Sequence, residues 1–519
     1  MRSKKSLLSA LTSLLPLIAC SCNTPPARYV DAVPWAIRQH GIHDAKSQPV
    51  NGQPGLRMDA VLLDRLNVCA AQPDLAEMKS QAIELFHDAH QLALSSTAVE
   101  LARLDDATWA ELAKRYYGAR VLIGDAEKQQ LADVFRRETE THIWFLCREI
   151  DQATSTQEVH RILNRVREQT EESAKTAGRT GRSVAFALFA VPSKIAQNSI
   201  HANEATCQLD QAFESAIRYV PTDGGSASPS IASSVTDAGH WQLLQRYAPI
   251  IVQEQCGDIE YPASFDLIGE VRANNDESID VETTRPAVYC YTRKILVGAR
   301  PHLQLIYAIW YPAHPKLREP VDPEEGKIDG ATVRITLDSQ MRPAILETLN
   351  NCGCHHRMYP VKSLDERAAG EFGSPLKGKS YAIEQDVTSK YDVIIPKLID
   401  PALGARPIVR CRAGTHAVVD VDFVDVWDGE PQFESREYRV ASYDELEMLR
   451  APNGRTTSMF ESNGLVRGAQ RLEGTLFAPL GMLNAGQPRQ RGTQLINWDQ
   501  FDFDDPRLFE KTVRLPSDF

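Results

Sequence analysis

The spacing of apolar residues divides the chain into two parts with different periods. Over residues 58–219, apolar side chains recur every three or four positions, which is the spacing of one helix face. Polar segments of the capping-box type, Thr108–Glu111 and Ser155–Glu158, accompany these periodic runs. One stripe consists of Met78, Ala82, Leu85, Ala89 and Leu92. We therefore predict about four to six antiparallel helices in this part of the chain.

Beyond residue 240 the period changes to two, which is the period of a β-strand. Residues 302–312, "HLQLIYAIWYP", carry apolar side chains at both odd and even positions, as expected for a central strand covered on both faces. Residues 331–338, "ATVRITLD", alternate instead. There we expect an inward face of Val333, Ile335 and Leu337 and a solvent face of Thr332, Arg334 and Thr336.

These two periods predict an α+β fold, with a helical N-terminal half followed by a mainly β C-terminal half. Residues 220–239 are rich in Gly, Ser, Pro and Asp and show no periodicity, so we interpret them as a linker or long loop. The expected organisation is a helical domain over residues 58–219 and a β-rich domain over residues 240–519.

The N-terminus has the layout of an export signal. Three of the first five residues are basic, and a short apolar run follows them. The run ends in "LIAC", residues 17–20, which resembles the lipobox of bacterial lipoproteins. That resemblance implies cleavage before Cys20 and acylation of the Cys20 thiol. An ordinary cleaved signal peptide, with Cys20 incidental, is the alternative.

We expect residues 1–19 to form the signal peptide and residues 20–57, which contain several Pro and Gly, to form a tether with one short docked piece. Ser21 follows the cysteine where Asp would favour the inner membrane, by resemblance to Gram-negative sorting rules. We therefore expect a protein anchored by lipid at the outer membrane and facing the periplasm, with the cell surface as a second possibility.

The charge composition of the chain excludes some classes of binding partner as the main ones. The chain has 69 acidic and 57 basic residues, a net charge of −12, and no compensating basic block. Nucleic acid and anionic lipid headgroups are therefore disfavoured as bulk partners. Hydrophobic residues make up 43% of the chain, which is enough to bury a substantial core.

One segment, "CGCHH", concentrates side chains that bind metals. If it is extended, Cys352, Cys354 and His356 share one face, and His355 points to the other. Two sulfurs and an imidazole are a plausible part of a tetrahedral zinc site. His416, on another predicted strand, is the expected fourth ligand.

Two other states of these cysteines stay open. An oxidising periplasm favours disulfides, in which Cys352 and Cys354 would pair with Cys411 or Cys290, or with each other in a small, strained ring. Alternatively, these cysteines are buried thiols without a chemical role. No metalloprotease, serine-hydrolase or P-loop motif accompanies them.

Six segments of the C-terminal half together look like a family of uncharacterised bacterial lipoproteins. The segments are "LQLIYAIWYP", "DGATVRITLD", "CGCHH", "GTHAVVDV", "GLVRGAQR" and "FDDPRL". The resemblance spans roughly residues 247–510 and includes a C-G-C-x-H element. It marks Cys352, Cys354, His356 and His416 as positions of interest, and it implies no activity.

Two functional interpretations follow. In the first, the protein is a cell-envelope binding or scaffold protein whose partner is an envelope protein or polymer. In the second, it is a hydrolase, in which the cluster around Cys352 holds zinc or Cys354 acts as a nucleophile beside a histidine. We favour the first, because no general base is identifiable beside the cluster.

Overall fold

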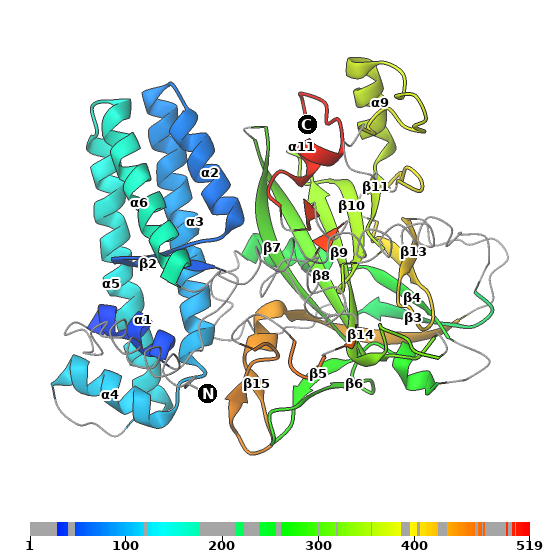
Figure 1. Cartoon of the computed structure of the whole chain (residues 1–519), viewed down its shortest axis with the longest axis horizontal. Coiled ribbons are helices and arrows are strands. Elements are labelled where there is room, and N and C mark those ends of the chain that lie inside the picture. Colours follow the sequence, from blue (N-terminus) through cyan, green and yellow to red (C-terminus); the bar gives the residue numbers. More distant parts are fainter. Residues whose placement is uncertain are drawn as a thin grey trace, which may run out of the picture.

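The computed structural model confirms the expected fold class, with helices α1 to α6 in the N-terminal half and a large mixed sheet in the C-terminal half (Figure 1). The structure describes residues 29–39, 47–118, 123–176, 213–222, 238–255, 261–298, 300–317, 320–353, 355–385, 395–401, 405–423, 433–461, 466–469, 471–472, 495–496, 501–503 and 505–519. Most of the expected linker, residues 223–237, lies outside these ranges.

The helices that start at Ala60, Leu75 and Asp106 each begin after a capping aspartate. Asp59, Asp74 and Asp105 each accept a hydrogen bond from the backbone N–H three residues later, which satisfies a free donor of the first helical turn. The helices are α1 (Tyr29–Gln39), α2 (Ala60–Ala71), α3 (Leu75–Leu101), α4 (Asp106–Tyr117), α5 (Asp125–Gln152) and α6 (Thr156–Thr176).

The region expected as a tether contains ordered elements. Helix α1 and the hairpin of β1 (Gln48–Val50) and β2 (Gln53–Met58) lie within residues 20–57. Strand β2 is joined to α3 by a buried ion pair in which both guanidinium nitrogens of Arg57 donate to Glu100, at 2.8 and 2.5 Å. In this bidentate pair, the buried charges of Arg57 and Glu100 neutralise each other within the helical core.

The apolar stripe predicted on α3 is part of the helical core. Met78, Ala82, Leu85 and Ala89 are buried and pack with side chains of α2, α5 and α6, while Leu92 is half-buried. Because α5 and α3 each bury only one stripe, their opposite faces are exposed. Among the described residues, none of the helices has both the length and the apolar character needed to cross a bilayer.

The C-terminal half is built on a ten-stranded mixed sheet with the order β11-β10-β9-β8-β7-β14-β3-β4-β12-β13. Strands β7 to β11 pair antiparallel, while β14 runs parallel to both β7 and β3. The strands are β3 (Ala216–Pro221), β4 (Ile250–Glu254), β7 (Ala287–Val297), β8 (Arg300–His314), β9 (Gly326–Leu337), β10 (Pro343–Asn350), β11 (Arg357–Pro360), β12 (Ile408–Cys411), β13 (Val418–Asp422) and β14 (Glu434–Ser442).

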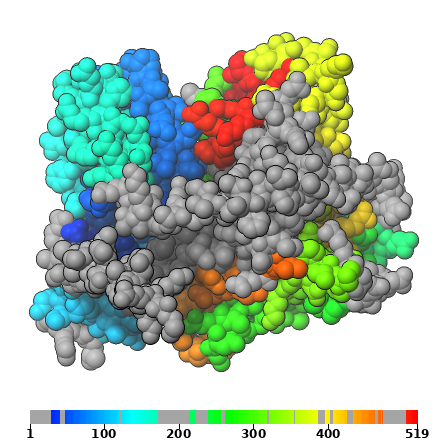
Figure 2. All heavy atoms as spheres, viewed as in Figure 1, coloured from blue at the N-terminus to red at the C-terminus, as the bar shows by residue number. Residues whose placement is uncertain are grey.

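Smaller elements surround this sheet. The strand pairs are β5 (Glu270–Ala273) with β6 (Ile279–Glu282), β15 (Leu449–Arg450) with β16 (Thr456–Thr457), and β17 (Leu495–Ile496) with β18 (Phe501–Asp502). The helices are α8 (Ala238–Arg246), α9 (Lys362–Phe372) and α11 (Leu508–Thr512), with 3₁₀ turns at Ala263–Asp266 and Tyr443–Glu447. The C-terminal segment (red) lies beside α9 (yellow), where Ser517 donates to Glu371 (Figure 2).

Strand β8 is covered on both faces, as its sequence predicts. Tyr307 and Tyr311 belong to the main core cluster, whereas Trp310 on the other face belongs to a second cluster. The neighbouring strand β9 differs from the prediction. Thr332, Arg334 and Thr336 are buried rather than facing solvent, so the predicted exposure of this face is wrong. The physical reason is that residues after position 500 cover it, with the Phe503 ring 3.6 Å from the Arg334 guanidinium.

The helical half lies beside the sheet and is joined to it by ion pairs (Figure 1). Asp88 of α3 contacts Lys294 of β7 at 3.2 Å, and Asp64 of α2 contacts Arg507 at 2.7 Å. These pairs are partly exposed, so each contributes little to stability. They show that α2 and α3 are the helices that face β7 and the C-terminal segment.

Candidate functional site

A pocket of about 1140 Å³ lies where the two halves meet, and we call it the junction pocket. Its helical wall comes from the end of α3, α4 and the start of α5, and its sheet wall comes from β5, β14 and the β15–β16 hairpin. Side chains on its walls include Leu101, Leu104, Trp109, Glu270, Arg285 and Arg439. Ligand sites are commonly found at such junctions.

The two walls differ in chemistry. On the helical side, Leu101, Leu104 and Trp109 are buried apolar residues of the core formed by α1, α4 and α5, so they form an apolar floor. On the sheet side, Tyr289 is also buried, and its hydroxyl accepts a hydrogen bond from the backbone N–H of Val271 at 2.9 Å. Burial raises the pKa of Tyr289, so this hydroxyl stays neutral.

Charged side chains line the outer part of the sheet wall. Glu270 contacts three guanidiniums, those of Arg272 at 3.4 Å, Arg285 at 3.2 Å and Arg439 at 3.1 Å. Burial by itself lowers the pKa of Arg439, but Glu445 and Glu270 more than offset this and raise it. Arg439 therefore keeps its positive charge.

The junction pocket has an excess of positive charge in an acidic protein. Its described lining has five basic side chains and three acidic ones, while the whole chain has a net charge of −12. The basic residues are Lys128, Arg272, Arg285, Arg439 and Arg450, and the acidic residues are Asp125, Glu270 and Glu445. An apolar floor with a cationic rim suits a ligand that carries both an apolar group and a negative charge.

The residues predicted from the sequence lie elsewhere. Cys20 and Cys354 fall outside the described residues. Cys352 follows β10, and His356 immediately precedes β11. His416 lies in the turn between β12 and β13. Its backbone N–H donates to the backbone oxygen of Arg412, and its φ is 52°. A positive φ is uncommon for residues other than glycine, although histidine adopts it more often than most.

His416 is 0% exposed and is surrounded by charged partners. Its Nδ1 donates to Asp329 at 2.7 Å, its Nε2 lies 3.4 Å from Asp266, and its ring stacks on Tyr311 at 3.9 Å. Asp329 also contacts Arg471 at 3.1 Å. The four charged groups therefore form a buried network of two cations and two carboxylates.

The pKa values of this network follow from its geometry. Burial by itself lowers the pKa of His416, but the hydrogen bonds to Asp266 and Asp329 more than offset this and raise it. Burial by itself raises the pKa of Asp329, but Arg471 and His416 hold it well below the ordinary range. His416 is thus held as a cation by the two carboxylates, which is a structural role for an inaccessible side chain.

His356 belongs to a second buried network. Its Nε2 lies 3.1 Å from Glu347, which also accepts two hydrogen bonds from Arg334 at 2.7 and 2.8 Å. Burial by itself raises the pKa of Glu347, but Arg334 and His356 lower it to about 2. The Phe503 ring packs against both the Arg334 guanidinium and the His356 ring.

The two networks lie on opposite faces of β9. Asp329, the partner of His416, and Arg334, the partner of Glu347, are five residues apart in a strand with continuous register, so their side chains point to opposite faces. The structure therefore does not bring His416 and His356 to a shared carboxylate. Within the described ranges, no group of three or more His, Cys, Asp or Glu side chains could hold a metal ion. The zinc site with Cys354 stays a prediction.

The cysteines expected as disulfide partners are single thiols. Cys290 and Cys411 are both buried and form no disulfide. The Cys290 thiol donates to the backbone oxygen of Ala441 at 3.3 Å, and burial raises the pKa of Cys411 to about 12. Pairing of these two with Cys352 or Cys354 is therefore not observed, and both are unreactive core residues.

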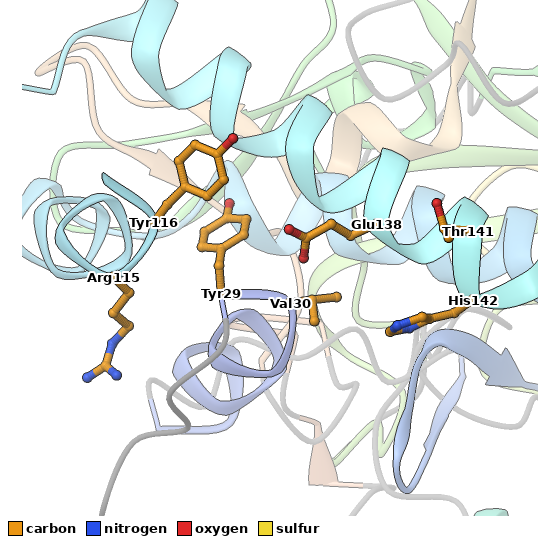
Figure 3. A pocket seen from close by; sticks show the side chains of 7 residues that line it. All are labelled: Tyr29, Val30, Arg115, Tyr116, Glu138, Thr141 and His142. Atoms are coloured by element: carbon orange, nitrogen blue, oxygen red, sulfur yellow. The ribbon is translucent and has the colours of Figure 1, made fainter. Parts of the chain in front are cut away.

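A second, smaller pocket of about 490 Å³ lies on the helical half. Figure 3 shows Tyr29 of α1 and Tyr116 of α4 lying together, with Glu138 beside them on α5. Thr141 and His142 follow one turn further along α5, and Arg115 points away from the group (Figure 3). The Tyr29 hydroxyl donates to the backbone oxygen of Leu131 at 2.8 Å, which fixes the start of α1 against α5.

Sequence patterns did not indicate the junction pocket, because its lining comes from segments up to about 360 positions apart in the chain. Its basic residues stand singly among acidic ones, so charge patterning gave no sign of them. No protein-family model, no curated protein and no solved structure matches the chain.

Proposed function

We propose that this protein is a lipid-anchored protein of the bacterial cell envelope that binds an anionic group of an envelope polymer or protein in the junction pocket. The observation that carries the binding function is the pocket itself, with its apolar floor and its excess of basic side chains. The anchor is supported by the "LIAC" sequence before Cys20 and by the resemblance to uncharacterised bacterial lipoproteins. The outer membrane, facing the periplasm, is the proposed location.

The hydrolase with zinc at Cys352, Cys354, His356 and His416 has less support. Both histidines are buried, and each is already engaged by a carboxylate. A catalytic metal site needs ligands that converge and an open coordination position for substrate.

The binding function predicts that the full chain binds 8-anilinonaphthalene-1-sulfonate, a small aromatic anion, in the junction pocket. Arg285→Gln should weaken this binding by about tenfold, because it removes one cationic contact at the rim. The Arg285 side chain is 63% exposed, so the fold should survive its replacement. Fluorescence titration gives the dissociation constants.

The matched control for this titration is Arg342→Gln. The Arg342 side chain is 55% exposed and pairs with Asp338 in the turn between β9 and β10, away from the pocket. The dissociation constant of Arg342→Gln for 8-anilinonaphthalene-1-sulfonate should equal that of the unmodified protein. Equal affinity for all three proteins, or no binding at all, would refute the assignment of the ligand to this pocket.

The anchor predicts incorporation of radiolabelled palmitate into the protein in Gram-negative cells. Cys20→Ser should abolish the labelling, because the acylated thiol is lost, whereas Cys22→Ser should retain it. Labelling that survives Cys20→Ser would show that Cys20 is not the acylated residue.

A further inference from the structure

The helical half carries a group of exposed aromatic side chains on α4 and α5, which we call the aromatic patch. It consists of Tyr116, Tyr117, Trp144 and Phe145, which are 40%, 37%, 54% and 57% exposed. The other large hydrophobic residues that are exposed in the described ranges lie singly in the β half, at Leu317, Val321, Met341, Phe372 and Leu472. Single exposed residues need no explanation, but a group of aromatics indicates an interaction surface.

The smaller pocket adjoins the aromatic patch at Tyr116 and continues along α5 to His142. Glu138, Thr141, His142 and Phe145 stand at positions i, i+3, i+4 and i+7 of α5, so they share one face. The Tyr116 ring contacts Tyr29 and Tyr117 at centroid distances of 5.5 and 4.9 Å. The Trp144 ring contacts Phe145 at 5.0 Å. Figure 3 shows the side chains of Tyr116, Glu138 and His142 one after another along the smaller pocket.

The patch lies close to the proposed anchor. Helix α1 begins at Tyr29, nine residues after Cys20, and Tyr29 packs directly against Tyr116. Nine residues reach about 30 Å when fully extended. A lipid on Cys20 therefore keeps this end of the helical half within about 30 Å of the bilayer.

We propose that the aromatic patch inserts into the interfacial layer of the bilayer that holds the acyl chains, as a second membrane contact. This inference rests on the proposed acylation of Cys20. Tyr and Trp side chains favour the membrane–water interface, because their rings are apolar and their polar groups reach water. The guanidinium of Arg148 lies over the Trp144 ring at 5.1 Å, where its stem can follow the ring into the interface and its charge can stay in water.

The chemistry of the contact indicates zwitterionic lipid. Charges of both signs lie beside the patch, those of Glu138, Arg115 and Arg148, in a chain of net charge −12, so attraction to anionic headgroups is not the main driving force. Burial of aromatic surface drives it instead. Insertion also orients the molecule, with α4 and α5 toward the membrane and α9 of the β half away from it (Figure 1).

The test uses the processed, acylated protein in phosphatidylcholine vesicles whose acyl chains are brominated near the headgroup. Bromine quenches tryptophan fluorescence at short range, so the difference in quenching between the unmodified protein and Trp144→Phe reports the position of Trp144. We expect the unmodified protein to be quenched clearly more than Trp144→Phe. Phe145→Trp in the Trp144→Phe background should restore the lost quenching.

The control is Phe372→Trp in the same Trp144→Phe background. Phe372 is an exposed aromatic residue on α9, and it should add fluorescence that brominated lipid leaves unquenched. If the protein carries acyl chains by intact mass and floats with the vesicles, but Trp144 contributes no quenching, the membrane contact is refuted and the anchor stands. If intact mass shows no acyl chains on Cys20, both the anchor and the contact are refuted.

Discussion

Replacing Asp329 by Asn is expected to lower the free energy of unfolding by about 3 to 5 kcal/mol, the typical cost of breaking a buried ion pair by removal of one partner. The carboxylate of Asp329 compensates both His416 and Arg471, and all three side chains are buried. The asparagine would leave these two cations with one carboxylate, Asp266, which lies 3.4 Å from His416. Urea denaturation followed by near-UV circular dichroism measures the change.

The control is Asp518→Asn, which removes an exposed carboxylate 3.1 Å from Arg367. Exposed ion pairs contribute about 0 to 1 kcal/mol, so this variant should be nearly as stable as the unmodified protein. If the two variants lose similar stability, the network around His416 does not have the structural role assigned to it.

The network around His416 also predicts that the stability of the protein depends on pH. The folded-state pKa of His416 is raised, so its contribution to stability is fully present below the unfolded pKa of about 6.5 and is lost as the pH rises through the folded-state pKa. The ring of His314 lies 6.3 Å from the His416 ring, and its effect on stability has the opposite sense, because burial lowers the pKa of His314. Asp329→Asn should therefore weaken the stabilisation that His416 gains by protonation, and Asp266 should retain part of it.

The second large effect is expected at Glu347, whose pKa is lowered to about 2. Its contribution to stability is present above the unfolded pKa of about 4.3 and is lost as the pH falls through about 2. The shift corresponds to about 3 kcal/mol. Glu347→Gln should cost a similar amount at neutral pH, because the amide cannot accept both Arg334 and His356 as a carboxylate does.

Acid titration of stability, followed by circular dichroism, tests this expectation. Between pH 4.5 and 2, the unmodified protein should lose more stability than Glu347→Gln, which has already lost the charge. Glu366→Gln is the matched control, since the Glu366 side chain is 65% exposed in a pair with Lys362 on α9. The same acid profile for Glu347→Gln and the unmodified protein would contradict the assignment.

Local periodicity was sufficient to predict the fold class. The stripe that includes Met78 and Leu85 is buried, because each helix buries one face whatever its partner is. The apolar residues on both faces of β8 likewise indicated a covered strand correctly. Helix α1 was expected only as one short docked piece, since Pro34 and the surrounding polar stretch weaken its helical pattern.

The buried networks could not be predicted, because their partners are far apart in the sequence. Arg334 looked like a solvent-facing residue of an alternating strand, and only the approach of Phe503, 169 positions later, buries it. His416 was expected to bind a metal with cysteines, whereas its partner Asp329 comes from β9, 87 positions earlier. Residue types alone did not distinguish a ligand from a structural cation, since histidine serves both roles.

The position of a bound anion tests the central claim, that the junction pocket is the binding site, most directly. Hydrogen–deuterium exchange of the full chain, with and without saturating 8-anilinonaphthalene-1-sulfonate, locates the segments that the anion protects. The structure predicts slower exchange in β5, Glu270–Ala273, and in residues 98–109 at the end of α3 and the start of α4. Protection confined to other segments, with these two unchanged, would contradict it.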